Sequence, residues 1–67
     1  MGIFMAAQHI IIRLPVVIQR TGLPRSSIYA HMAEGRFPKQ IKLGSKACGW
    51  IETEIDEWIE SRINASR

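Results

Sequence analysis

The sequence predicts an α+β, mainly helical fold: a winged helix-turn-helix made of two short helices, a β-hairpin wing and a C-terminal helix. Three observations predict it. Two short helical patterns flank a glycine turn near residue 22, a period-two pattern follows at residues 40–43, and the clearest helical pattern runs over residues 51–63. A chain of 67 residues holds one small domain. We expect that domain at residues 12–67, preceded at residues 1–11 by a flexible tail or a short edge strand.

The first helix is predicted to begin at Pro15, whose fixed φ suits the first helical position. Before it, the β-branched stretch from His9 to Arg13 fits either an edge strand or the approach to this helix. Gly22 should end the helix, because glycine adopts the left-handed conformation without strain. One helical face is formed by residues at the spacing i, i+3, i+4 and i+7, namely Leu14, Val17, Ile18 and Thr21.

The second helix is predicted from Pro24 or Arg25 to Glu34, with Ile28 on its buried side. A single residue separates Gly22 from Pro24, so the connection between the helices is tight. Two short helices joined by such a turn are typical of a helix-turn-helix.

The hairpin is predicted from a change of period. Ile41 and Leu43 alternate with polar residues, residues 44–46 read GSK and supply a turn, and residues 47–51 return as the partner strand. Gly49 in the returning strand either lets helix and hairpin approach closely or simply stands in place of alanine.

The third helix shows apolar residues at i, i+4, i+7, i+8 and i+12 from residue 51. Thr53 and Asp56 have nearly the spacing of a capping box, and acids crowd the first half of the helix, where the helix dipole favours them. Because this helix carries the acids, we expect it to be a brace that packs behind the basic elements of the chain. Trp50 and Trp58 are core candidates, and Trp58 is expected to close the core.

Charge is divided unevenly along the chain. Residues 1–50 hold seven basic residues and one acid, a net charge of +6, whereas residues 51–67 hold two basic residues and five acids, a net charge of −3. A concentrated basic region is the electrostatic footprint expected of a nucleic-acid binder.

Several function classes lack the residues they need. One cysteine, Cys48, and two histidines, His9 and His31, cannot make an internal disulfide or the usual four-ligand zinc site. No Ser-His-Asp set, carboxylate pair or glycine-rich phosphate loop is visible, so we expect no enzyme, no cofactor and no small-molecule ligand. With neither a membrane-spanning run nor a signal peptide, a cytoplasmic location is expected.

The stretch RLPVVIQRTGLPRSSIYAHMAEGRFPKQIKLGSKACGWIETEIDEWIESR resembles the AlpA-type prophage regulators, small winged-helix proteins related to the MerR DNA-binding head and to phage excisionases, and the resemblance covers about residues 12–63. The most specific pieces are RTGL followed by RSSIY, then EGRFPKQIKLG, then EIDEWI. The resemblance implies a cofactor-free DNA-binding activator or excision factor of a mobile element. The chain departs from the family pattern at Pro24, Ala30 and His31, which bears on the DNA sequence read.

The residues expected to contact DNA fall in two groups. Arg25, at the start of the second helix, is the first choice for reading guanine, with a phosphate contact or a free surface charge as alternatives. The other members are Ser26, Ser27 and Tyr29 of the same helix, and Arg36, Lys39, Lys42 and Lys46 towards and within the wing. The serines could instead cap the helix, Tyr29 could be a packing residue, and the wing cations could form a solvated face.

Three functions remain open at this point. The first is sequence-specific binding of double-stranded DNA by a small prophage transcriptional regulator, with the second helix in the major groove and the basic wing on the backbone. The second is an excisionase that bends attachment-site DNA, and the third is a protein-binding adaptor. Integrase, RNA polymerase and neighbouring copies of the chain on DNA are the protein partners considered.

Overall fold

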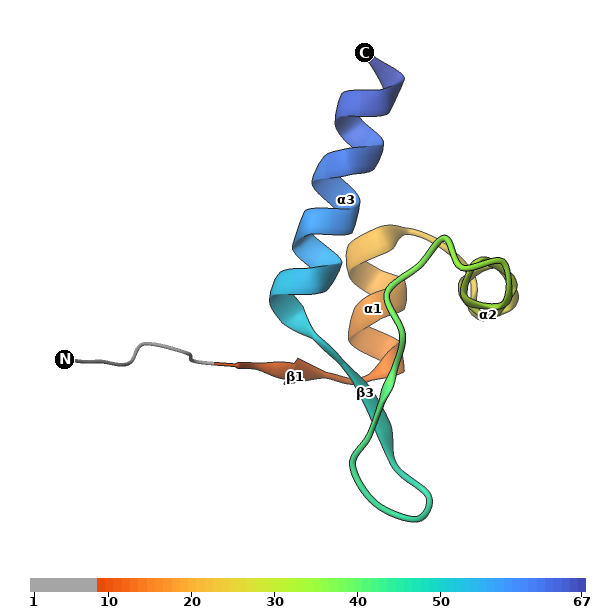
Figure 1. Ribbon diagram of the computed structural model, residues 1–67, viewed down its shortest axis with the longest axis vertical. Coiled ribbons are helices and arrows are strands. Elements are labelled where there is room, and N and C mark those ends of the chain that lie inside the picture. The colour runs from red at the N-terminus through yellow and green to blue at the C-terminus, as the bar shows by residue number, and fades with distance from the viewer. Residues whose placement is uncertain (1–8) are drawn as a thin grey trace, which may run out of the picture.

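A computed structural model describes residues 9–67 and confirms the α+β, mainly helical architecture (Figure 1). In chain order the elements are β1 (Ile11–Ile12), α1 (Leu14–Thr21), α2 (Arg25–Ala33), β2 (Ile41–Lys42), β3 (Cys48–Ile51) and α3 (Glu52–Ser66). At residues 11–12 the chain forms an edge strand, whereas the tail expected over residues 1–8 lies outside the described residues.

Helix α1 begins one residue before the predicted Pro15, because the Arg13 carbonyl already accepts the amides of Val16 and Val17, at 3.0 and 3.1 Å. Its end is as predicted: Gly22 has φ 74° and donates its amide to the Ile18 carbonyl. The Thr21 hydroxyl then accepts the Leu23 amide at 3.3 Å, which fixes the turn into α2.

The strands form an antiparallel three-stranded sheet in the order β1-β3-β2. Residues alternate between its two faces, and paired residues share a face. Ile12, Trp50, Cys48 and Lys42 therefore lie on the face towards the helices, which we call the inner face. The opposite, outer face carries Ile11, Ile51, Gly49 and Ile41.

Gly49 is required by the sheet itself. A Cβ at Gly49 would lie 2.5 Å from Ile11 Cγ2 and 3.0 Å from the Ile12 carbonyl oxygen. The close approach predicted between helix and hairpin is wrong, because residue 49 lies on the outer face, where the side chains of Ile11 and Leu43 lean over it. The alternative that glycine merely stands in place of alanine is also wrong, because the Cβ of an alanine would lie too close to Ile11 and to the Ile12 carbonyl oxygen.

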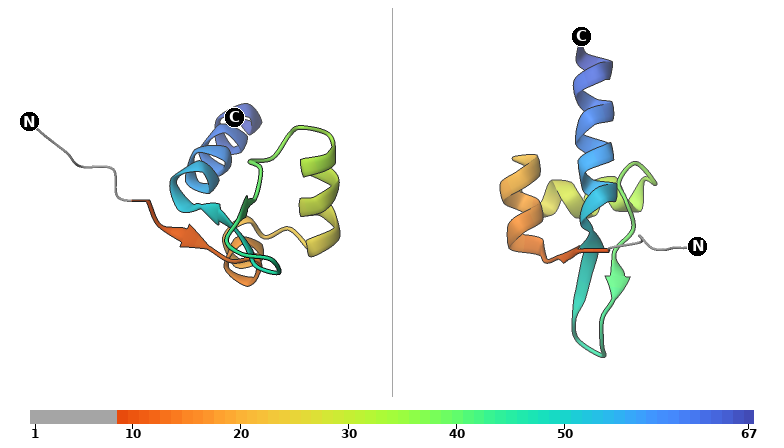
Figure 2. Two further views of the ribbon diagram at one scale, coloured as in Figure 1. Left: turned by 60° about the horizontal axis from the view of Figure 1, so that its bottom comes forward. Right: turned by 90° about the vertical axis from the view of Figure 1, so that its left-hand side faces the viewer.

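Helix α3 continues directly from β3 and extends away from the sheet in the direction opposite to the hairpin (Figure 2). The predicted capping box at Thr53 and Asp56 is wrong: Ile51 is the N-cap, and no side chain caps the helix. The reason is tertiary, since the Glu52 amide donates to the Ile10 carbonyl at 2.7 Å and so extends the pairing of β1 with β3.

The core is built around Trp50, which is 1% exposed, rather than around Trp58, which is half-buried at its edge beside His31. Phe37, which the sequence patterns did not single out, packs edge-on against both tryptophans, with ring centroids 6.5 Å from Trp50 and 4.8 Å from Trp58. Among residues 9–67, the buried hydrophobic side chains are Ile12, Val17, Ile28, Phe37, Trp50 and Ile55.

Candidate nucleic-acid interface

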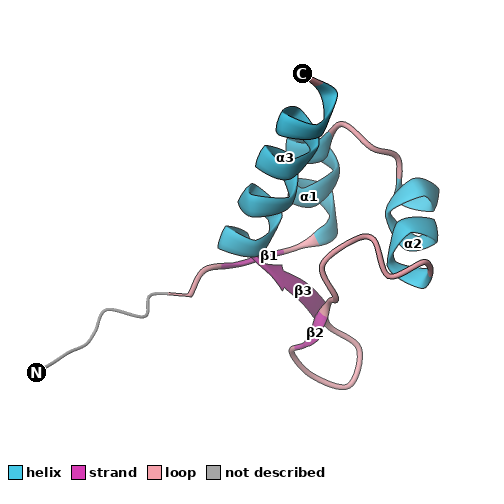
Figure 3. Cartoon of the chain, turned by 45° about the horizontal axis from the view of Figure 1, so that its top comes forward, coloured by secondary structure: helices cyan, strands magenta, loops and turns pink. Residues whose placement is uncertain are grey.

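Helix α2 lies to one side of α1 and α3, and the hairpin projects at the lower end of the sheet (Figure 3). Its single fully buried residue, Ile28, anchors it to the core. With Ile28 inward, the helical period turns Ser26, Ala30 and Ala33 to solvent, and all three are exposed as predicted.

Arg25 and Tyr29, four residues apart on α2, lie against each other on its exposed side. The Arg25 guanidinium carbon lies 5.7 Å from the Tyr29 ring centroid, within the range of a cation–π contact. Tyr29 is 38% exposed, so its ring serves as a platform for the arginine rather than as a core residue. The N-terminal turn of α2 thus presents a cation held in position by its own helix.

Neither Ser26 nor Ser27 caps α2, so the capping alternative is wrong. Pro24 is the N-cap, and its carbonyl accepts the amides of Ser27 and Ile28, each at 3.1 Å. The N-cap residue is thus a proline, whose side chain has no oxygen to accept an amide, and the first turn of α2 has no side-chain cap. Ser26 is fully exposed and Ser27 half-buried, which leaves both hydroxyls free of that role.

A hollow of about 420 Å³ separates α2 from the hairpin, and we call it the wing hollow. Tyr29 contributes one wall, Lys46 of the hairpin loop another, and Arg13 at the start of α1 a third. Lys42 lies on the same sheet face as Cys48 and Trp50, which complete the lining together with Leu14, Pro15 and Gln40. The wing hollow is therefore lined by two cations from distant parts of the chain, Arg13 and Lys46.

Arg13 is a member of this hollow that the sequence reasoning missed. The available signal was its position two residues before Pro15, next to the predicted helix start, where the helix dipole disfavours a cation. A basic residue at an unfavourable helix end is a reason to look for an anionic ligand.

The predicted residues do not all share one surface. Arg36 and Lys39 line a different groove, of about 750 Å³, between residues 35–41 and α3, whose other wall carries Glu54 and Glu57. Arg36 also lies 3.9 Å from Glu34, measured between Nε and Oε1. These two cations have acids as neighbours, unlike those of the wing hollow.

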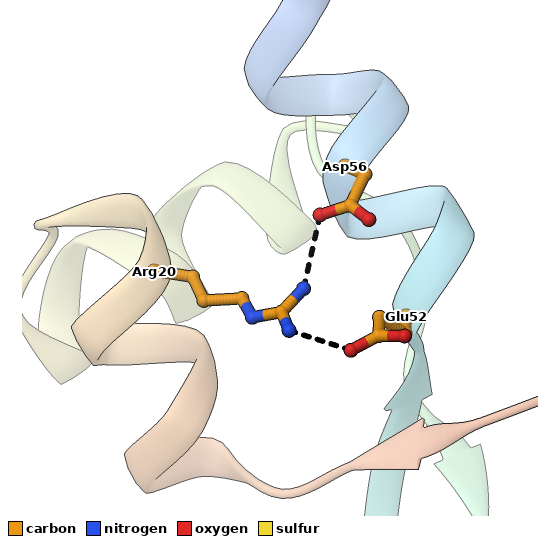
Figure 4. Close-up of polar contacts among 3 residues, drawn as sticks. All are labelled: Arg20, Glu52 and Asp56. Carbon is orange, nitrogen blue, oxygen red and sulfur yellow. Dashed lines mark hydrogen bonds and ion pairs between the residues drawn. The ribbon is translucent and has the colours of Figure 1, made fainter.

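One arginine of the basic half is neutralised by α3. Arg20 donates from Nη2 to Glu52 at 2.6 Å and from Nη1 to Asp56 at 3.0 Å (Figure 4). Its charge is therefore partly offset by two acids of α3. The fork ties α1 to α3, which is the bracing role predicted for α3.

Within residues 9–67, no cluster of three or more His, Cys, Asp or Glu residues could hold a metal ion. Over the same residues, no helix is long and apolar enough to cross a membrane.

A tight helix pair, a hairpin beside its second helix and a bracing third helix define a winged helix-turn-helix protein with a cationic hollow between helix and wing. The family model described as "Prophage CP4-57 regulatory protein (AlpA)" matches residues 10–63, and the chain belongs to this family. The resemblance to AlpA-type regulators is thereby confirmed.

Two relatives show how far the likeness extends. The chain is 48% identical over 58 residues to the "DNA-binding transcriptional activator AlpA" of Escherichia coli (strain K12), covering 78% of this chain and 83% of that protein. It is 39% identical over 56 residues to the "Uncharacterized protein ORF88" of Enterobacteria phage P4, covering 84% of this chain and 64% of that protein. No solved structure matches the chain significantly.

Proposed function

We propose that this protein binds double-stranded DNA sequence-specifically, as a small transcriptional regulator of a prophage or related mobile element. The observation that carries the proposal is the wing hollow: cations from α1 and the hairpin flank the exposed side of α2. The name of the Escherichia coli relative, a DNA-binding transcriptional activator, supports the same activity.

In this proposal α2 enters the major groove, which is about 12 Å wide and admits one helix. Its N-terminal end points to the bases, as in other helix-turn-helix proteins. Arg25 then reads guanine with two hydrogen bonds, and the Tyr29 ring limits the directions its guanidinium can take. Ser26 and Ser27 bond a base edge or a phosphate, since neither is used as a cap.

The wing hollow holds the sugar–phosphate backbone beside that groove. Lys46 and Arg13, which line it, contribute charge, and Lys42 adds a cation from the sheet face that carries Cys48. Phosphate binding of this kind requires positive charge and reach but no base-specific geometry. Arg36 and Lys39 contribute less in this scheme, because Glu34, Glu54 and Glu57 share their surroundings.

A single module of this size buries about 600–1,000 Å² on DNA, so one copy reads few base pairs. We therefore propose that several copies occupy repeated sites and that RNA polymerase or an integrase contacts the assembled copies. Footprinting should then show more than one protected site in phase with the helical repeat. A single isolated site with nanomolar affinity would contradict this arrangement.

The experiment that tests DNA binding is selection of duplexes from a random pool by the purified chain, followed by anisotropy titration of the best duplex at several salt concentrations. For a DNA binder, the logarithm of the affinity falls linearly with the logarithm of the salt concentration, with a slope of about −0.9 per phosphate neutralised. An adaptor would show no enrichment and no affinity for duplex. Arg67→Ala, which removes an exposed cation at the far end of α3, is the matched control.

A further inference from the structure

The outer face of the sheet is an apolar surface: its Ile41 and Ile51 also line the groove beside α3, whereas Ile11 and Leu43 lie outside that groove. Its residues are Ile11, Ile41, Leu43, Gly49 and Ile51, none of which is charged. Ile11 is 36% exposed and Leu43 is 45% exposed. Burying such surface contributes about 25 cal/mol per Å², so a contiguous exposed patch in a small domain indicates a missing neighbour.

The shape of this face follows from Gly49. Without a Cβ in the middle strand, the side chains of Ile11 and Leu43 lean over the backbone from the two outer strands. The result is a low surface formed by side chains from all three strands, bounded at one edge by β1.

The area of this face is too small for a second folded copy. A stable dimer buries about 800 Å² on each partner, from roughly 20–30 residues. Five residues on strands of two to four residues provide only a fraction of that. The occupant that fits is therefore a short stretch of extended chain.

The chain carries such a stretch next to this face. Residues 1–8 read MGIFMAAQ, with Ile3, Phe4 and Met5 in succession and no charged side chain. Only two residues separate them from Ile11, which itself belongs to the outer face. Eight extended residues reach roughly 26 Å, enough to cross a three-stranded sheet about 10 Å wide. A tether this short also gives a millimolar effective concentration.

We propose that residues 1–8 dock on the outer face of the sheet through Phe4 and its apolar neighbours. The docked segment covers Ile11 and Leu43 and completes the burial of a domain whose core is small. It lies on the sheet face opposite Lys42 and Cys48, so it leaves the wing hollow open. The proposal does not depend on DNA binding.

The direct test is NMR of the full chain with labelled Ile and Leu methyl groups. Docking predicts nuclear Overhauser contacts between the Phe4 ring and the methyl groups of Ile11 and Leu43, together with ring-current shifts that Phe4→Ala abolishes. Absence of both would overturn the proposal. Contacts seen only between differently labelled molecules in a mixed sample would also overturn it, in favour of a second copy.

A mutant cycle provides an independent test with a matched control. Leu43 and Ile63 are equally exposed, at 45%, but Ile63 lies on α3, away from the sheet. Leu43→Lys should lower the Tm of the full chain by roughly 4–8 °C, which is typical of a modest loss of stability in a domain this small. The same substitution should lower the Tm of a chain lacking residues 2–8 by much less. Ile63→Lys should act equally in both. Equal effects of Leu43→Lys in the two chains would refute the docking, whatever the DNA titrations show.

Discussion

The indole N–H of Trp58 donates a hydrogen bond of 2.7 Å to the carbonyl of Arg36, joining α3 to the segment between α2 and the hairpin. Trp50 makes the equivalent bond two residues further on, to the Pro38 carbonyl at 3.1 Å. Phe37 lies between these two anchors and packs against both rings. The tryptophans thus hold the segment between α2 and the hairpin, on which the proposed mode of DNA binding depends.

Trp58→Phe should lower the free energy of unfolding by about 1–2 kcal/mol, because it leaves the Arg36 carbonyl without its donor while keeping an aromatic ring. Trp58→Ala should cost about 3 kcal/mol, since packing against Phe37 is lost as well. Urea unfolding followed by circular dichroism measures both. A Trp58→Phe variant as stable as the parent would show that the indole bond does not hold the segment.

Gly49→Ala should destabilise the domain by about 1–3 kcal/mol, because the new methyl group meets the Ile12 carbonyl oxygen and the Ile11 side chain. Gly44→Ala is the control, since nothing lies within 4 Å of a Cβ there. Thermal unfolding of the two variants measures the difference. Equal melting temperatures would contradict the close strand contact.

Arg20→Gln should lower stability by at most about 1 kcal/mol, with the loss shrinking as salt is added, because its partners Glu52 and Asp56 are partly exposed. Affinity for duplex DNA should stay within twofold of the parent, since this arginine is already paired. Denaturation at two salt concentrations and one anisotropy titration check both statements. A large loss of DNA affinity in a folded variant would place Arg20 in the interface.

Arg25→Ala should weaken binding to the selected duplex by about 1–3 kcal/mol and relax the preference at one base pair. Arg25→Lys should recover affinity but not that preference, because lysine cannot make the paired hydrogen bonds of a guanidinium. Tyr29→Leu should weaken binding and relax the base preference less than Arg25→Ala does, because it removes only the contact between the Arg25 guanidinium and the Tyr29 ring. Competition with single-base variants of the duplex distinguishes these cases, and a sequence-blind loss for Arg25→Ala would reject a base contact.

Lys46→Ala and Arg13→Ala should each weaken all duplexes similarly and reduce the salt slope by about one unit. The two residues line the same hollow from different parts of the chain, so their effects should resemble each other. Lys39→Ala should have the smaller effect, because its groove also holds Glu54 and Glu57. The reverse order would indicate that DNA lies along that groove instead.

The local order of the chain could be read from the sequence. Proline, glycine and the helical period specify where α1 and α2 begin and end to within a residue, since these are properties of neighbouring residues: Gly22 at positive φ and Ile28 as the buried anchor of α2 are examples. The family, too, could be recognised from the quoted motifs. The eight candidate contact residues remain predictions, although the structure excludes the capping role considered for two of them.

Only tertiary structure decided how distant residues meet. The expected capping box at the start of α3 is absent. The Glu52 amide instead donates to the Ile10 carbonyl, which extends the pairing of β1 with β3. Arg20 forms ion pairs with two acids that are more than thirty residues away in the sequence. Arg13, Tyr29 and Lys46, which come from three segments of the chain, line one hollow. Periodicity reports which side of an element is buried, but not which element covers it; that is determined by packing of the whole chain.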